Sequence, residues 1–163
     1  MGVYEEKSLD SVDKFILVLP FLAILEVASA LYVESLGYPL VRYEAGFFSR
    51  FFVGAGLTYV YAVIYLLIIV GFAYVLWYIK KKLSSSHSFD KVIFLFLVSV
   101  TCYIYMRLTA AFIGNFLLPH ILSRGVNWFS LNLLIYLSTA LSLVFYLWRD
   151  VIIWLRAKGE GNE

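Results

Sequence analysis

Four long apolar stretches limit what this chain of 163 residues can fold into. They are residues Phe15–Leu36, Phe51–Ile79, Val92–Leu118 and Val126–Trp148. The only charged residues inside them are Glu26 and Glu34 in the first stretch and Arg107 in the third. A helix needs about 20 apolar residues to cross the hydrocarbon core of a bilayer, and each stretch is long enough. The sequence therefore predicts an all-α integral membrane protein, a four-helix bundle.

Composition supports this class. Hydrophobic residues make up 63% of the chain and charged residues 15%, whereas soluble domains have about 45–50% and about 25%. We expect residues 1–163 to form a single transmembrane domain with helices over about 11–36, 47–79, 90–118 and 126–155. Gly37 and Pro39 should end the first helix and Pro119 the third, because proline cannot donate the next backbone hydrogen bond. Pro20 should bend the first helix.

The basic residues predict the orientation. Nine of them lie on one side of a four-span arrangement: Lys7, Lys14, Lys80, Lys81, Lys82, Lys91, Arg149, Arg156 and Lys158. Three lie on the other side: Arg42, Arg50 and Arg124. Because cytoplasmic loops carry an excess of lysine and arginine, both termini are expected in the cytoplasm, in a multi-pass protein of the cell membrane.

Several other expectations concern partners and cofactors. Lys80, Lys81 and Lys82 should attract anionic lipid headgroups at the cytoplasmic surface. The nearly complete lack of polar domains predicts a homo-oligomer or a place in a larger membrane complex, without nucleic acid and without a cofactor. Cys102 is the only cysteine, so neither an intrachain disulfide nor a cysteine metal cluster is expected. Glutamine is absent, which points to a thermophilic source.

The charges inside the apolar stretches predict an ion pair. Glu26 comes 12 residues after Lys14, and Arg107 comes 16 residues after Lys91. The first and third helices run in the same direction, so the two side chains differ in depth by only about 6 Å. A lone charge at mid-membrane costs at least about 2.5–3.5 kcal/mol. Glu26 and Arg107 are therefore predicted to pair inside the bundle.

Small and polar residues at helical spacing mark the same interior. Thr58, Tyr61 and Tyr65 share one face of the second helix, and Asn132 and Tyr136 share one face of the fourth. Such residues bring helices close together and form hydrogen bonds between them. The predicted buried polar set is Glu26, Arg107, Asn115, Asn132, Tyr136 and Tyr61.

Three functions follow from these features as alternatives. The first is a structural or accessory subunit, or a homo-oligomer, in which the ion pair fixes helix register. The second is a small transporter or channel component that handles protons or ions through Glu26. The third is a lipid-acting membrane enzyme with its site on the outer face, although the chain contains neither HExxH nor GxSxG. The candidate outer-face residues are Glu34, Arg42, Glu44, Arg50, His120 and Arg124.

The segments LEVASALYVESLG, from Leu25, and RYEAGFFSRFFVGAG, from Arg42, resemble a group of small, uncharacterised prokaryotic four-helix membrane proteins. That group carries an acidic residue and hydroxyl residues in helix one and an E-x-N-P motif before helix two. By this resemblance Glu26 is the acidic residue, Ser29 a hydroxyl position and Glu44 the glutamate of the motif. Gly46 and Phe47 stand where the group has Asn and Pro. The resemblance implies a fold of four helices and a role for Glu26 and Glu44.

Overall fold

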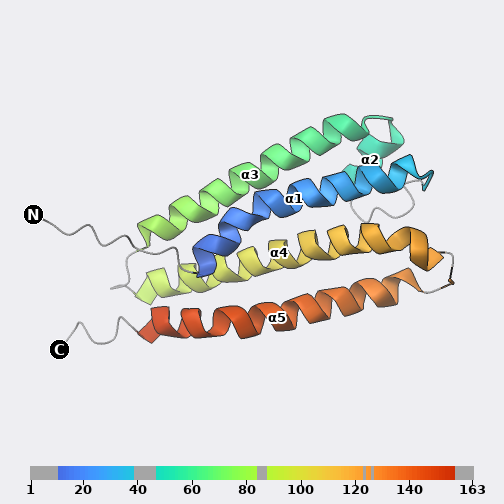
Figure 1. The fold of residues 1–163 in the computed structure, drawn as a ribbon. Coiled ribbons are helices and arrows are strands. Elements are labelled where there is room, and N and C mark those ends of the chain that lie inside the picture. Colours follow the sequence, from blue (N-terminus) through green and yellow to red (C-terminus); the bar gives the residue numbers. More distant parts are fainter. Residues whose placement is uncertain (1–10, 39–46, 84–87, 123, 126, 157–163) are drawn as a thin grey trace, which may run out of the picture.

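The computed structural model describes residues 11–38, 47–83, 88–122, 124–125 and 127–156. These residues form five α-helices and no strand (Figure 1). The helices are α1 (Ser11–Ser35), α2 (Phe47–Gly54), α3 (Thr58–Lys82), α4 (Ser88–Leu122) and α5 (Trp128–Arg156). The four helices other than α2 are long and apolar enough to cross a membrane, as the hydropathy of the sequence predicts.

Helix α1 ends where the sequence indicates. Gly37 adopts a φ of 85°, which is in the left-handed region that glycine occupies without steric cost. Its N–H donates to the Glu34 carbonyl at 2.9 Å, and the Tyr38 N–H donates to the Val33 carbonyl at 3.3 Å. This pair of bonds is the Schellman motif, which satisfies the last carbonyls of a helix. Pro20 lies inside α1, as expected.

The prediction of one helix over residues 47–79 is wrong. Gly56 has a φ of 74°, and a second Schellman motif ends α2 there. The Gly56 N–H donates to Val53 and the Leu57 N–H donates to Phe52. Helix α3 then starts at Thr58. The break falls inside an uncharged stretch, so hydropathy does not reveal it, and its only local signal is the Gly54–Ala55–Gly56 sequence.

The predicted end of the third helix is also wrong. Helix α4 continues through Pro119 to Leu122. Proline at this position removes one backbone hydrogen bond but leaves the remaining bonds of the last turn in place. Helix α5 differs from its prediction by only one or two residues at each end, which is within the usual uncertainty of helix boundaries.

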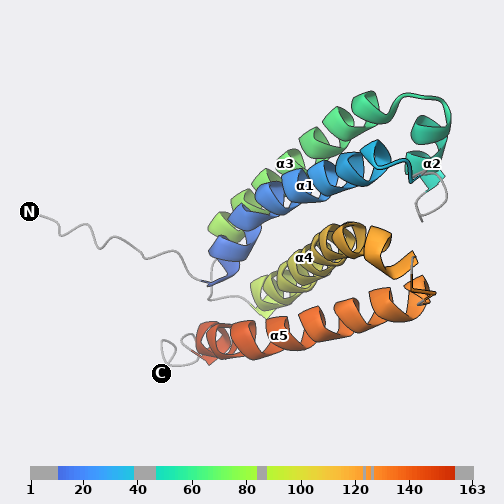
Figure 2. The same cartoon turned by 45° about the vertical axis from the view of Figure 1, so that its right-hand side comes forward.

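The long helices form an open bundle in the order α3, α1, α4, α5 (Figures 1 and 2). Helix α1 packs most extensively on α4 and also on α3, while α5 packs mainly on α4. Within the described residues, α3 and α5 do not touch. Helix α2 lies beside the end of α1 and the start of α3. We call this the α2 end and the opposite end, where α3 finishes, the Lys80 end.

Two apolar clusters hold the helices together. The larger one includes Ile16, Leu19 and Ala23 of α1, packed with residues of α3, α4 and α5 such as Phe94 and Leu108. The smaller one, at the α2 end, centres on Val33 and Leu118. The part of α1 between the two clusters contains Glu26 and Ser29. Polar side chains are therefore concentrated in a layer with apolar packing above and below it.

Candidate functional site: a polar layer between the helices

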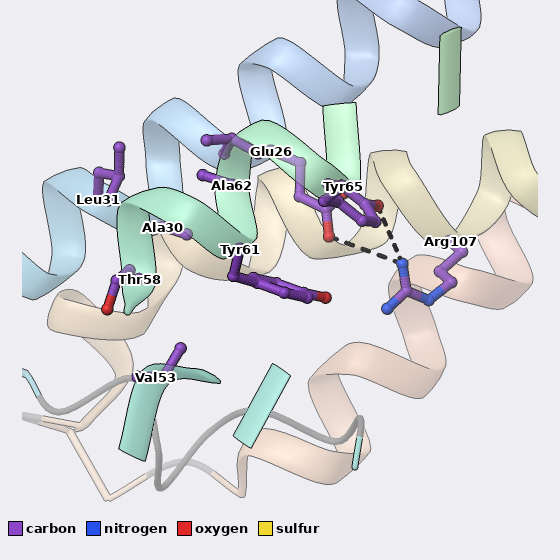
Figure 3. Close-up of a pocket in the computed structure, with 10 residues that line it drawn as sticks. Glu26, Ala30, Leu31, Val53, Thr58, Tyr61, Ala62, Tyr65 and Arg107 are labelled. Atoms are coloured by element: carbon purple, nitrogen blue, oxygen red, sulfur yellow. Dashed lines mark hydrogen bonds and ion pairs between the residues drawn. The ribbon is translucent and has the colours of Figure 1, made fainter. Parts of the chain in front are cut away.

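Glu26, Tyr65 and Arg107 meet where α1, α3 and α4 face one another (Figure 3). The Tyr65 hydroxyl donates a hydrogen bond to Glu26 Oε2 at 2.5 Å. It also accepts one from an Nη atom of Arg107 at 3.1 Å. A phenol can donate one hydrogen bond and accept another, so Tyr65 suits a position between a carboxylate and a guanidinium.

The direct contact between the two charges is longer. The Arg107 Nη atom lies 3.8 Å from Glu26 Oε1, which is within the range of an ion pair but beyond that of a hydrogen bond. The Glu26 side chain is 14% exposed and that of Arg107 is 41% exposed. The two charges therefore attract each other at close range, while the hydrogen bonds that orient them run through Tyr65.

A second set of hydrogen bonds joins α1 to α4 one turn away. The Asn115 amide donates to Ser29 Oγ at 3.2 Å. Ser29 is buried, and its hydroxyl donates to the backbone carbonyl of Glu26 at 2.7 Å. The single hydroxyl hydrogen of Ser29 is thus used within its own helix, and its oxygen accepts the bond from the other. We refer to Glu26, Ser29, Tyr65, Arg107 and Asn115 as the polar layer.

Aromatic rings connect the polar layer to α2. The rings of Tyr65 and Tyr61 stack with centroids 5.9 Å apart and planes inclined by 25°. Tyr61 stacks in turn on Phe52 of α2 at 5.8 Å. Offset stacking at these distances is favourable beyond the area that it buries. The stack keeps the start of α3 and the end of α2 against each other across the break at Gly56.

A small pocket of about 40 Å³ adjoins Glu26 on the side of the α2 end. Its polar lining comes from Glu26, Thr58, Tyr61, Tyr65 and Arg107 (Figure 3). Its apolar lining includes Ala30, Ala62 and Val53 of α2. A pocket of this volume has room for at least one water molecule.

The structure brings together part of the predicted buried polar set. Glu26 and Arg107 are paired, Tyr61 lies beside them in the stack, and Asn115 reaches α1 through Ser29. Tyr136 of α5 is within electrostatic range of Arg107. Asn132 is half-buried on α5, and the described structure contains no hydrogen bond between it and the polar layer.

Tyr65 was not among the predicted site residues, although it is the side chain that bonds to both charges. Its spacing from Tyr61 placed it on the same face of the predicted second helix. Many residues of an apolar helix share that spacing, so the spacing does not distinguish Tyr65 from Tyr61. Only the position of α3 next to Glu26 in three dimensions identifies Tyr65 as a site residue.

The predicted outer-face set is only partly described. Arg42 and Glu44 lie outside the described residues. The other four come from four different segments: Glu34 near the end of α1, Arg50 on α2, His120 near the end of α4 and Arg124 in the turn after it. Arg50, His120 and Arg124 are exposed. Within the described chain, no group of three or more His, Cys, Asp or Glu side chains is placed to hold a metal ion.

The lysines at the end of α3 differ in their surroundings. Lys80 Nζ lies 2.7 Å from Asp13 of α1, and its side chain is only 9% exposed. Lys81 lies over the Trp77 ring at 3.7 Å from its centroid, and Lys82 lies over Tyr78 at 5.6 Å. Lys80 therefore serves as a link between α1 and α3, and only Lys81 and Lys82 of the three are exposed.

No protein-family model, curated protein or solved structure matches this chain.

Proposed function

We propose that this chain is a multi-pass protein of the cell membrane that works as a subunit of a membrane assembly, in its simplest form a homo-oligomer. Both termini are on the cytoplasmic side in this proposal, because nine of the twelve basic residues outside the apolar stretches lie on that side. The polar layer holds α1, α3 and α4 in register. The length and apolar character of four helices support the membrane location.

The exposure of Arg107 carries the proposal. Arg107 lies 19 residues after Ser88 and 15 before Leu122, close to the centre of α4. Its side chain is 41% exposed in the single chain, on a helix whose neighbours α3 and α5 do not touch. A charge that faces lipid at this depth costs at least about 2.5–3.5 kcal/mol. Protein that covers this face would remove much of that cost.

A photo-crosslinking experiment tests the assembly. Tyr103 lies one helical turn before Arg107 and is 62% exposed. With p-benzoylphenylalanine in place of Tyr103, irradiation of native membranes should give an adduct of twice the 18.7 kDa chain mass. Phe145 of α5, 82% exposed, is the matched control position and should give lipid adducts. Lipid adducts alone at both positions would contradict an assembly, and an adduct with a different protein would assign the chain to a hetero-assembly.

The pocket beside Glu26 favours a second candidate function, a component that handles protons or small ions. A carboxylate in a membrane interior is a recurrent part of proton and ion routes, and the pocket adjoins this one. Proteoliposomes that contain a pH-sensitive dye should then show proton entry with the wild-type chain and not with Glu26→Gln. Equal rates for the two proteins would eliminate this candidate and leave the assembly proposal unaffected.

A further inference from the structure

The two sides of Glu26 along α1 differ sharply in chemistry. Toward the Lys80 end, Ala23, Leu19 and Ile16 are at most 1% exposed and belong to the large apolar cluster. Toward the α2 end, the pocket is bordered by the carboxylate, by two tyrosines and by Thr58, the first residue of α3. Water that reaches Glu26 would meet apolar side chains on one side, including an apolar pocket between α1 and α3 lined by Ile16 and Ala73, and polar groups on the other.

The pocket provides what buried water needs. A buried water molecule requires two to four polar partners, and the lining supplies a carboxylate, three hydroxyl groups and a guanidinium from α1, α3 and α4. Glu26 Oε1 and the Arg107 guanidinium are 3.8 Å apart, which is longer than a direct hydrogen bond. Water in the pocket would add hydrogen bonds to these polar groups.

We infer that this pocket is a hydrated site, open to water and small monovalent cations from the α2 end and closed toward the Lys80 end. Glu26 thereby exchanges with the solution on one side of the membrane only. The inference requires that the chain spans a membrane, and it is independent of whether the chain self-associates.

Silver ions can test the hydration, because Ag⁺ is small and reacts with thiolates, which form only where water is present. Two alanines on α1 provide a matched pair. Ala30 lines the pocket, whereas Ala28 is exposed on the outside of the helix. Each is changed to cysteine in a Cys102→Ala background. Vesicles of known orientation are treated with Ag⁺ in nitrate buffer, and the thiols that remain are counted with N-ethylmaleimide after denaturation.

Two exposed positions, one at each end of the bundle, identify the two faces of the membrane. Ala55→Cys, in the turn before α3, should react with a membrane-impermeant maleimide from one face and Lys82→Cys from the other. Failure of this calibration would show that the four-span arrangement is wrong, which is a separate result from the behaviour of the pocket.

We expect Ag⁺ to block Ala30→Cys from the Ala55 face only and to leave Ala28→Cys reactive from both faces. If Ag⁺ blocks Ala55→Cys but leaves Ala30→Cys reactive toward maleimide, the pocket is dry and the inference is wrong. The inference would also be wrong if Ag⁺ blocked Ala30→Cys from the Lys82 face, or if it blocked Ala28→Cys as strongly as Ala30→Cys. Should Ala30→Cys fail to fold, Ala62→Cys in the pocket with Val63→Cys as its lipid-facing control repeats the test on α3.

Discussion

The Tyr65 hydroxyl, in the first half of α3, donates a hydrogen bond to the Glu26 carboxylate in the middle of α1. The same oxygen accepts a bond from Arg107 of α4, so a single phenol oxygen connects three helices. Removal of the Tyr65 hydroxyl should therefore lower the stability of the protein more than removal of an exposed tyrosine hydroxyl of α3.

Tyr65→Phe should lower the free energy of unfolding in detergent by about 1.5–3 kcal/mol, the range for hydrogen bonds to charged groups. The ring and its stacking on Tyr61 are kept in this variant, so only the hydroxyl is lost. Tyr59, 74% exposed on the same helix, provides the control, and Tyr59→Phe should leave the thermal midpoint unchanged. Equal midpoints for the two variants would mean that the Tyr65 hydroxyl contributes nothing to stability.

Glu26 and Arg107 should be energetically coupled. At a separation of 3.8 Å and with Arg107 partly exposed, we expect a coupling energy of about 1–3 kcal/mol, less than the full cost of breaking a tightly bonded buried pair. A double-mutant cycle with Glu26→Gln and Arg107→Met measures it. In a Tyr65→Phe background the coupling should fall, because part of it passes through the phenol. A coupling near zero in the wild-type background would show that the pair is not a stabilising contact.

Ser29 and Asn115 should also be coupled, but more weakly. Hydrogen bonds between membrane helices contribute about 0.6 kcal/mol on average and up to about 1.7. Ser29→Ala removes the acceptor for Asn115, whereas Ser35→Ala removes an exposed hydroxyl that donates to the Tyr32 carbonyl of its own helix. We expect a lower thermal midpoint for the first and no change for the second. Asn115→Ala should cause little further loss once Ser29 is alanine.

Lys80 and Lys81 should respond differently to the same substitution. Lys80→Met breaks the 2.7 Å pair with Asp13 and should destabilise the protein by about 1–3 kcal/mol, between the values for surface and buried pairs. Lys81→Met should leave stability nearly unchanged. It should instead reduce binding to vesicles that contain anionic lipid, since an exposed lysine contributes about 1 kcal/mol at such a surface. Thermal unfolding and vesicle flotation of both variants separate the two roles.

Thr109→Val should be neutral or stabilising. The Thr109 hydroxyl oxygen is buried and has no hydrogen-bond partner among the described residues, so valine removes an unsatisfied polar group at nearly constant volume. Thr101, also on α4, is the control because its buried hydroxyl donates to the Leu97 carbonyl at 2.8 Å. Thr101→Val should lower the thermal midpoint. A larger loss for Thr109→Val than for Thr101→Val would show that the Thr109 hydroxyl has a partner in solution.

The number of long helices and the meeting of Glu26 with Arg107 could both be predicted from the sequence. Apolar length along the chain is a local property, and it determines which segments can cross a bilayer. The depth of a residue in the bilayer can also be estimated from the sequence, because residue counts convert directly into distance along a helix. Two opposite charges at similar depth in helices of the same direction therefore had few other partners available.

The identity of the bridging residue was decided only by tertiary structure. A helix that is apolar on all sides has no polar face to indicate which side turns inward. The sequence therefore could not determine which helices are neighbours, or how each is rotated. Those two choices place the Tyr65 hydroxyl between Glu26 and Arg107, connect Asn115 to Ser29 and direct Lys80 to Asp13. They also keep α3 away from α5 within the described residues. They depend on side chains far apart in the sequence, whereas hydropathy depends on neighbours along the chain.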